Sequence, residues 1–290
     1  MSRKSLSLIS LVLVFALLFG FSGCSLIETE EEETTVVSVK TPLPTDVTSS
    51  VDDDGNTITD TEYSPEALAA NTATIFDYFN ANINAVKSAK AAVSFNSRPG
   101  IGKAEDEEGN RLPYCENEYL AAAFGGIKDK FVQRGSDSAM YGESLDKLLP
   151  VKGTSDVSLL TLDEIESATC VDDGAVRTVT VNLKSPVEQT SARKAFDLVD
   201  AEAVVNEFAV AEKYITVGTP EVTYKTFTII LKINVETDEI TQIRYEKSSD
   251  VTVLVTGNGE LEDIGTVPLT FNYSVTDTYD FDYTEPETEA

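Results

Sequence analysis

The last third of the chain alternates between apolar and polar residues, and this pattern constrains the fold more than any other feature. An alternation with a period of two places all the apolar side chains of a β-strand on one face. The pattern covers residues 227–235, 243–245, 251–255, 267–275 and 279–283, with a turn expected at 237–239 and a loop at 257–259. Strands joined by short turns pair antiparallel, so we expect a sheet with one covered face.

Helices are expected mainly before this sheet. Ser64 followed by Pro65 is a helix start signal, and an apolar stripe then follows at spacings of four, four and three, formed by Ile75, Phe79, Ile83 and Val86. We expect this helix to end near residue 93 and the chain to break at residues 98–100. Further helices are predicted over about 117–132, 161–168 and 200–212. The helix over 161–168 is predicted from the capping-box residues Thr161 and Glu164. A strand is expected after the turn at 172–174. Helices followed by a meander predict an α+β fold.

The N-terminus has the layout of a secretory signal. Arg3 and Lys4 precede a dense apolar run over residues 8–19, and small residues lead to Cys24. The segment Phe21-Ser22-Gly23-Cys24 resembles the lipobox of bacterial lipoproteins, although those families usually carry leucine where this chain has Phe21. The resemblance implies that residues 1–23 are a signal peptide and that the Cys24 sulfur carries acyl chains, such as palmitate. It places the protein at the cell membrane, on the cell-surface side, outside the cytoplasm.

Two alternatives to lipidation remain open. Residues 5–27 carry no charge, and that length can span a bilayer, which needs roughly 20 apolar residues. An uncleaved anchor is therefore one alternative, and plain secretion is the other. The small residues Gly20, Ser22 and Gly23 favour cleavage. Lipidation and an uncleaved anchor both leave everything after residue 27 outside the cell.

Composition divides the rest of the chain and excludes several functions. Residues 24–62 are acidic and rich in Thr and Ser, which predicts a disordered tether after the lipidated cysteine. Residues 63–284 are expected to form a single domain, and residues 285–290 an acidic tail.

The net charge of −28 argues against binding nucleic acid, where Lys and Arg must neutralise phosphates. The chain has no His, which excludes Ser–His and Cys–His catalysis and His-ligated metals.

Three segments have spacings that resemble those of catalytic or metal-binding motifs. Residues 144–147 and 191–194 both have the Ser-x-x-Lys spacing, but the Ser-Asp-Asn and Lys-Thr-Gly elements that accompany it in penicillin-recognising enzymes are missing. An EF-hand loop starting at residue 50 would need Asp there and Glu at residue 61, where the chain has Ser50 and Thr61. We therefore expect no catalytic residue, no metal and no cofactor.

Cys115 and Cys170 remain once Cys24 is lipidated. Outside the cytoplasm such a pair can form a disulfide. The alternative is two free thiols, as in a reducing habitat.

The overall layout resembles uncharacterised lipoproteins of Gram-positive, clostridia-type bacteria. The resemblance rests on the lipobox, the acidic Thr-rich tether, the C-terminal meander, and a helix with Phe79, Asn80, Asn84 and Lys87. At a coarser level, the element order over residues 64–284 is similar to lipid-carrier lipoproteins of the LolA/LppX kind. That similarity implies a curved antiparallel sheet, like half of a barrel, packed against several helices and sheltering acyl chains.

Three classes of function follow. The first is a membrane-anchored lipoprotein that binds or carries a lipid or another apolar ligand. The second is a surface interaction or structural lipoprotein, whose partner is another surface protein and which has no small ligand. The third and most remote is an extracytoplasmic hydrolase that uses carboxylates alone.

Overall fold

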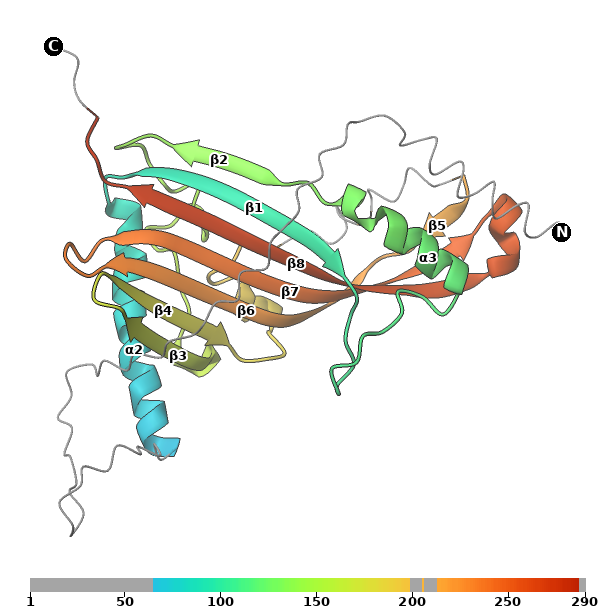
Figure 1. Ribbon diagram of the computed structural model, residues 1–290, viewed down its shortest axis with the longest axis horizontal. Helices are drawn as coiled ribbons and strands as arrows, with labels where there is room; N and C mark the ends of the chain where they lie inside the picture. Colours follow the sequence, from blue (N-terminus) through green and yellow to red (C-terminus); the bar gives the residue numbers. More distant parts are fainter. Residues whose placement is uncertain (1–64, 199–204, 206–212, 287–290) are drawn as a thin grey trace, which may run out of the picture.

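The computed structural model describes residues 65–198, 205 and 213–286. In this part of the chain, eight strands form one open antiparallel sheet in the order β2-β1-β8-β7-β6-β4-β3, with β5 paired to β7 (Figure 1). The strands are β1 (Ala92–Gly102), β2 (Gly135–Ala139), β3 (Ile165–Asp172), β4 (Val176–Leu183), β5 (Ile215–Val217), β6 (Glu221–Asn234), β7 (Ile240–Gly257) and β8 (Thr266–Asp282). The α+β class with a curved antiparallel sheet is confirmed.

The helical elements of the described residues are few and mostly short. They are α2 (Pro65–Ala85), α3 (Glu118–Ile127), α4 (Gln189–Ala192), and the 3₁₀ turns η1 (Val86–Ser88), η2 (Lys128–Phe131), η3 (Leu162–Glu164) and η5 (Gly259–Ile264). Helix α2 crosses one end of the sheet, and α3 lies at the other end (Figure 1). Within residues 65–198 and 213–286, no helix is long and apolar enough to cross a membrane.

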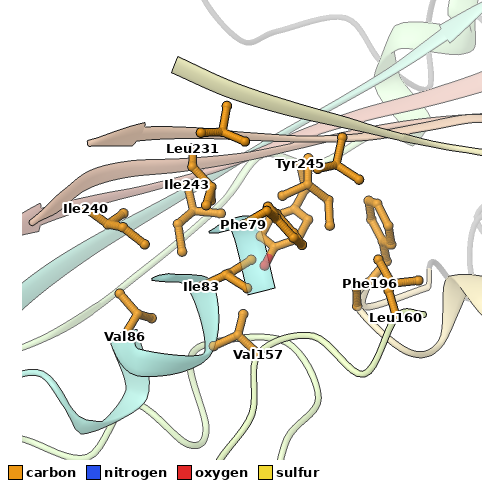
Figure 2. Close-up of a cluster of buried hydrophobic side chains, with 14 of the residues drawn as sticks. Phe79, Ile83, Val86, Val157, Leu160, Phe196, Leu231, Ile240, Ile243 and Tyr245 are labelled. Atoms are coloured by element: carbon orange, nitrogen blue, oxygen red, sulfur yellow. The ribbon is translucent and has the colours of Figure 1, made fainter. Parts of the chain in front are cut away.

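One face of the sheet, here called the inner face, carries the buried side chains of β7 and β8. At the end crossed by α2, these side chains belong to the first cluster. There the predicted apolar stripe of α2 is confirmed, since Ile75, Phe79, Ile83 and Val86 are all buried. Figure 2 shows Phe79 and Ile83 of α2 lying beneath Ile243 and Tyr245 of β7. Burying an aromatic or branched side chain stabilises the fold by about 1.5–3 kcal/mol.

The second cluster lies at the other end of the same inner face. It contains Val251 and Val253 of β7, Leu269 and Phe271 of β8, and Phe124 of α3. The Phe124 and Phe271 rings lie 5.5 Å apart between centroids. The helix predicted over 117–132 is confirmed as α3 followed by η2.

Polar residues of α2 and η1 that carried the resemblance have structural roles. The Asn84 amide donates to the carbonyl of Ser158, and its Oδ1 accepts from the backbone N–H groups of Val157 and Ser158, at 2.8–2.9 Å. The Lys87 ammonium donates to the carbonyls of Val151 and Thr154. These bonds satisfy backbone groups of the loop that packs on α2.

The predicted break at residues 98–100 is wrong, because these residues lie inside β1. Pro99 is paired in register with Val275 of β8. On its other side β1 pairs with β2 only over residues 93–97. At Pro99 the strand is therefore an edge, which is where a sheet tolerates proline. The helix predicted to reach residue 93 ends earlier, since β1 starts at Ala92.

The helix predicted over residues 161–168 is also wrong. The capping box exists, because the Thr161 N–H and hydroxyl both donate to Glu164 Oε2 at 2.9 Å. It caps only the turn η3, and β3 begins directly afterwards at Ile165. Pairing of β3 with β4 along almost its whole length overrides the local helix signal.

Other strands in the structure differ in length from the predicted ones. The turn at 237–239 is confirmed between β6 and β7. The segments 243–245 and 251–255 belong to the single strand β7. The segments 267–275 and 279–283 are joined in β8, which ends at Asp282. No strand was predicted at β1, β2, β3 or β5.

Several predictions fall outside the described residues. These are the signal peptide, Cys24, the tether with Ser50 and Thr61, and residues 287–290. The helix predicted over 200–212 also lies outside them, except for Val205, which is helical and buried in the second cluster.

Candidate functional site

A belt of polar side chains separates the two apolar clusters on the inner face. Along β7 the inner positions run Tyr245, Lys247, Ser249 and Val251, and on β8 Asp277 lies in register with Tyr245. Lys247, Ser249 and Asp277, here called the polar belt, are each only 7–8% exposed. Lysine and aspartate are almost never buried this deeply unless they are paired.

Lys247 and Asp277 form a buried ion pair. The Lys247 ammonium donates to Asp277 Oδ2 at 2.5 Å and to the backbone carbonyl of Asp197 at 2.8 Å. An ammonium has three donors, and the described residues supply two acceptors. Replacing a buried ion pair by apolar residues is often neutral or stabilising, so stability alone does not account for this one.

Tyr245 adds an unpaired polar group beside the ion pair. Its side chain is 1% exposed, and its hydroxyl has no hydrogen-bond partner among the described residues. Figure 2 shows the side chain projecting from the sheet toward α2. Burial, and then the neighbouring Tyr279 and the carboxylates of Asp197 and Asp277, raise the pKa of Tyr245 well above its ordinary value. The hydroxyl therefore stays protonated and can donate a hydrogen bond.

The belt is flanked by side chains that are only partly buried. Ser97 of β1 is in register with Asp277, while Tyr224 of β6 and Tyr273 of β8 are both in register with Ser249. All three are partly exposed to solvent. Burial and the Asp277 carboxylate raise the pKa of Tyr273 to about 12, so its hydroxyl is also neutral. The inner face is thus less completely covered next to the belt than within the first cluster.

The sequence contained a signal for this site that was missed. Lys247 and Asp277 occupy positions of the alternation where the neighbouring inner residues are apolar or aromatic, such as Tyr245, Val275 and Tyr279. A charged residue in phase with the buried face of a strand indicates a buried charge. The strand order and the register decide which strands pair, and therefore which charged side chains come into contact.

The Ser-x-x-Lys motif of residues 191–194 lies against the carboxylate of Glu164. The Ser191 hydroxyl donates to Glu164 Oε1 at 2.7 Å, and Lys194 forms an ion pair with the same oxygen at 2.8 Å. Burial alone would raise the pKa of Glu164, but hydrogen bonds from Lys194, Ser191 and Thr161 outweigh it and hold the pKa at about 2. A carboxylate with so low a pKa is a poor general base for a serine hydroxyl. The cluster ties η3 to α4 instead.

Glu164→Gln is expected to lower the free energy of unfolding by about 2 kcal/mol at neutral pH, allowing for the partial exposure of the carboxylate. The folded pKa of about 2 lies below the ordinary 4.5, so the carboxylate stabilises above pH 4.5. That contribution disappears as the pH falls toward 2. Urea unfolding at pH 7 and pH 3 should show a smaller difference between variant and wild type at pH 3. The exposed Glu166 of β3 provides a control, Glu166→Gln, and an equal loss there would contradict the prediction.

The other Ser-x-x-Lys motif, residues 144–147, lies in a turn. The Ser144 hydroxyl accepts a hydrogen bond from the Asp146 N–H at 3.3 Å in an exposed turn. In the described part of the chain, no group of three or more Cys, Asp or Glu side chains is placed to hold a metal ion.

Of the two alternatives left open for Cys115 and Cys170, a disulfide or two free thiols, the structure has the free thiols. Cys115 lies beside Leu269 of β8, in the second cluster. When the strand pairing is followed from β3 across β4, β6 and β7 to β8, Cys170 is level with Tyr279. Ten residues of β8 separate these two points, which is about 33 Å along a strand. A disulfide needs Cα atoms within about 7 Å.

Comparison with known proteins adds no relative. No protein-family model matches the chain, and no curated protein or solved structure matches it either.

Proposed function

We propose that the protein is a membrane-anchored extracytoplasmic lipoprotein, held by acyl chains on Cys24, that binds a lipid or another apolar ligand on the inner face of its sheet. The observation that carries the proposal is the polar belt. A buried ion pair lies between two apolar clusters of one face, and Tyr245, a residue of the first cluster in register with Asp277, adds an unpaired buried hydroxyl. Ligand sites for apolar molecules have this composition, with a few polar groups among many apolar ones.

Binding is tested with the mature protein, freed of bound lipid and titrated with the uncharged fluorescent probe N-phenyl-1-naphthylamine. Saturable binding near one probe per protein is expected. Lipid extracted from the native host should then displace the probe. A linear signal without saturation, and no displacement, would overturn ligand binding.

The anchor is tested separately. Mass spectrometry of protein from its native host should find residues 1–23 removed and Cys24 carrying a diacylglyceryl group. Cys24→Ser should abolish acylation and move the protein out of the detergent phase on Triton X-114 partition, because no acyl chain then holds it. Cys170→Ser is the matched control and should stay in the detergent phase. Intact residues 1–23 on the wild-type protein would favour the uncleaved anchor.

A surface interaction or structural lipoprotein without a small ligand is the second candidate. The first cluster favours it, because its inner-face side chains are covered by the chain's own Phe79, Ile83, Leu145 and Leu149, all 0% exposed. The part of the first cluster around Phe79 and Ile83 is therefore filled by the chain's own side chains. The failed titration described above is the outcome that would select this candidate.

A carboxylate hydrolase is the least supported. Such an enzyme needs one carboxyl whose pKa is raised, so that it is protonated and can act as an acid. The described carboxyl groups with a clear pKa shift are all shifted downward, by hydrogen bonds that favour the ionised form; they are Asp106, Asp163, Glu164, Asp173 and Asp282.

A further inference from the structure

We infer that the polar belt, together with Tyr245, recognises the uncharged, oxygen-rich head of an amphiphile, such as the ester and hydroxyl groups of an acylglycerol, while its acyl chain lies along the second cluster. This inference rests on the proposed ligand binding and names the class of ligand. Unused hydrogen-bond donors, the charge of the ion pair and the difference between the two clusters support it.

The unused polar groups at the belt are donors. Two of the three protons on the Lys247 ammonium have acceptors among the described residues. The Tyr245 hydroxyl has no partner there and is neutral. Both side chains project from the inner face of β7 two residues apart, which places their Cβ atoms about 7 Å from each other. A ligand that satisfies both must bring acceptor oxygens.

The charge of the site favours an uncharged head over an anion. Lys247 is already neutralised by Asp277 at 2.5 Å, and both side chains are at most 10% exposed. A fatty-acid carboxylate placed beside this pair would add an unbalanced buried charge next to Asp277, which is costly. The chain as a whole also carries a net charge of −28, which repels anions. Ester and hydroxyl oxygens accept hydrogen bonds without that cost.

The second cluster suits the acyl chain better than the first. In the first cluster, Phe79 and Ile83 of α2 are fully buried against the sheet. Around the second cluster, apolar side chains of several strands remain only partly buried, including Val217, Val222, Val267 and Tyr273. Of these, Tyr273 is in register with Ser249 of the belt, and Val222 is in register with Val251, directly beyond it. Apolar surface that the protein leaves partly exposed there can be covered by an acyl chain.

The experiment compares two amphiphiles with the same chain, monoolein and oleate, as competitors for N-phenyl-1-naphthylamine bound to the mature full-length protein. Monoolein should displace the probe at about tenfold lower concentration than oleate, since two added hydrogen bonds correspond to a factor of that order. Equal or stronger displacement by oleate would overturn the inference. The probe itself reports apolar binding, so its failure to bind would instead count against the proposed function.

Variants identify the residues that recognise the head. Tyr245→Phe removes only the unpaired hydroxyl and should bring the preference for monoolein down about threefold with probe binding unchanged. The double variant Lys247→Met/Asp277→Leu removes the belt's charges while keeping its volume, and should abolish the preference. Thr276→Val, on the opposite face of β8, is the matched control and should leave it intact. An unchanged preference in both the Tyr245 variant and the double variant would assign the belt a purely structural role and overturn the inference.

Discussion

Asp277→Leu is expected to lower the free energy of unfolding by about 3–5 kcal/mol, because it leaves the ammonium of Lys247 buried without a counter-ion. Lys247 would keep only the Asp197 carbonyl as an acceptor. Its side chain is 7% exposed, so water cannot replace the lost carboxylate without opening the inner face. Equilibrium unfolding in urea, followed by circular dichroism, measures the change.

The double variant Lys247→Met/Asp277→Leu separates the cost of a lone charge from the value of the pair. Both partners are then apolar and similar in volume to the originals, so the stability should return to within about 1 kcal/mol of the wild type or exceed it. A double variant as unstable as Asp277→Leu would contradict this account. It would mean that the ion pair itself stabilises the join between the two clusters.

Gly257→Ala is expected to cost about 3 kcal/mol, near the upper end of the usual range for overpacking. Gly257 is the last residue of β7, where the chain turns into η5, and its N–H donates to the carbonyl of Gly265 at 2.9 Å. A Cβ atom there would collide with the backbone carbonyl oxygen of Leu261 and lie 2.8 Å from its carbonyl carbon. Backbone atoms cannot rotate away as a side-chain tip can, so the β7–β8 connection must shift.

Gly126→Ala is the matched control for this prediction. Gly126 lies inside α3, and a Cβ built on it meets nothing within 4 Å. Alanine is the better helix former by about 1 kcal/mol, so this variant should be slightly more stable than the wild type. Thermal unfolding of both variants should move in opposite directions. A Gly257→Ala protein with an unchanged melting temperature would show that the turn relaxes without cost.

The sheet could be predicted because its signal is local. Every second residue of β7 and β8 is apolar over much of their length, and that pattern identifies strands and their buried face before any partner is known. The stripe of α2 is local in the same sense. The segments that were predicted wrongly, around Pro99 and Thr161, carry local signals for breaks and caps. In these two segments, the free energy gained by pairing with β8 and with β4 outweighs the local conformational preference for a break or a helix.

The candidate site could not be assembled from the sequence. Lys247 and Asp277 are thirty residues apart in the chain, and their contact depends on the register that places Tyr245 opposite Asp277. A shift of that register by one residue would send one partner to the opposite face. The meeting of Ser191 and Lys194 with Glu164 is equally a product of packing, and the pKa that results makes it a structural tie.

The sequence by itself determined the signal at Cys24 as a prediction, the α+β class, and the buried face of β4, β6, β7 and β8, because hydrophobic periodicity and short motifs act between neighbours along the chain. The tertiary structure alone decided which charged groups meet inside, that Cys115 and Cys170 lie far apart, and that Tyr245 has an unpaired hydroxyl. These depend on strand order and register, which are set by the packing free energy of the whole sheet rather than by any one segment.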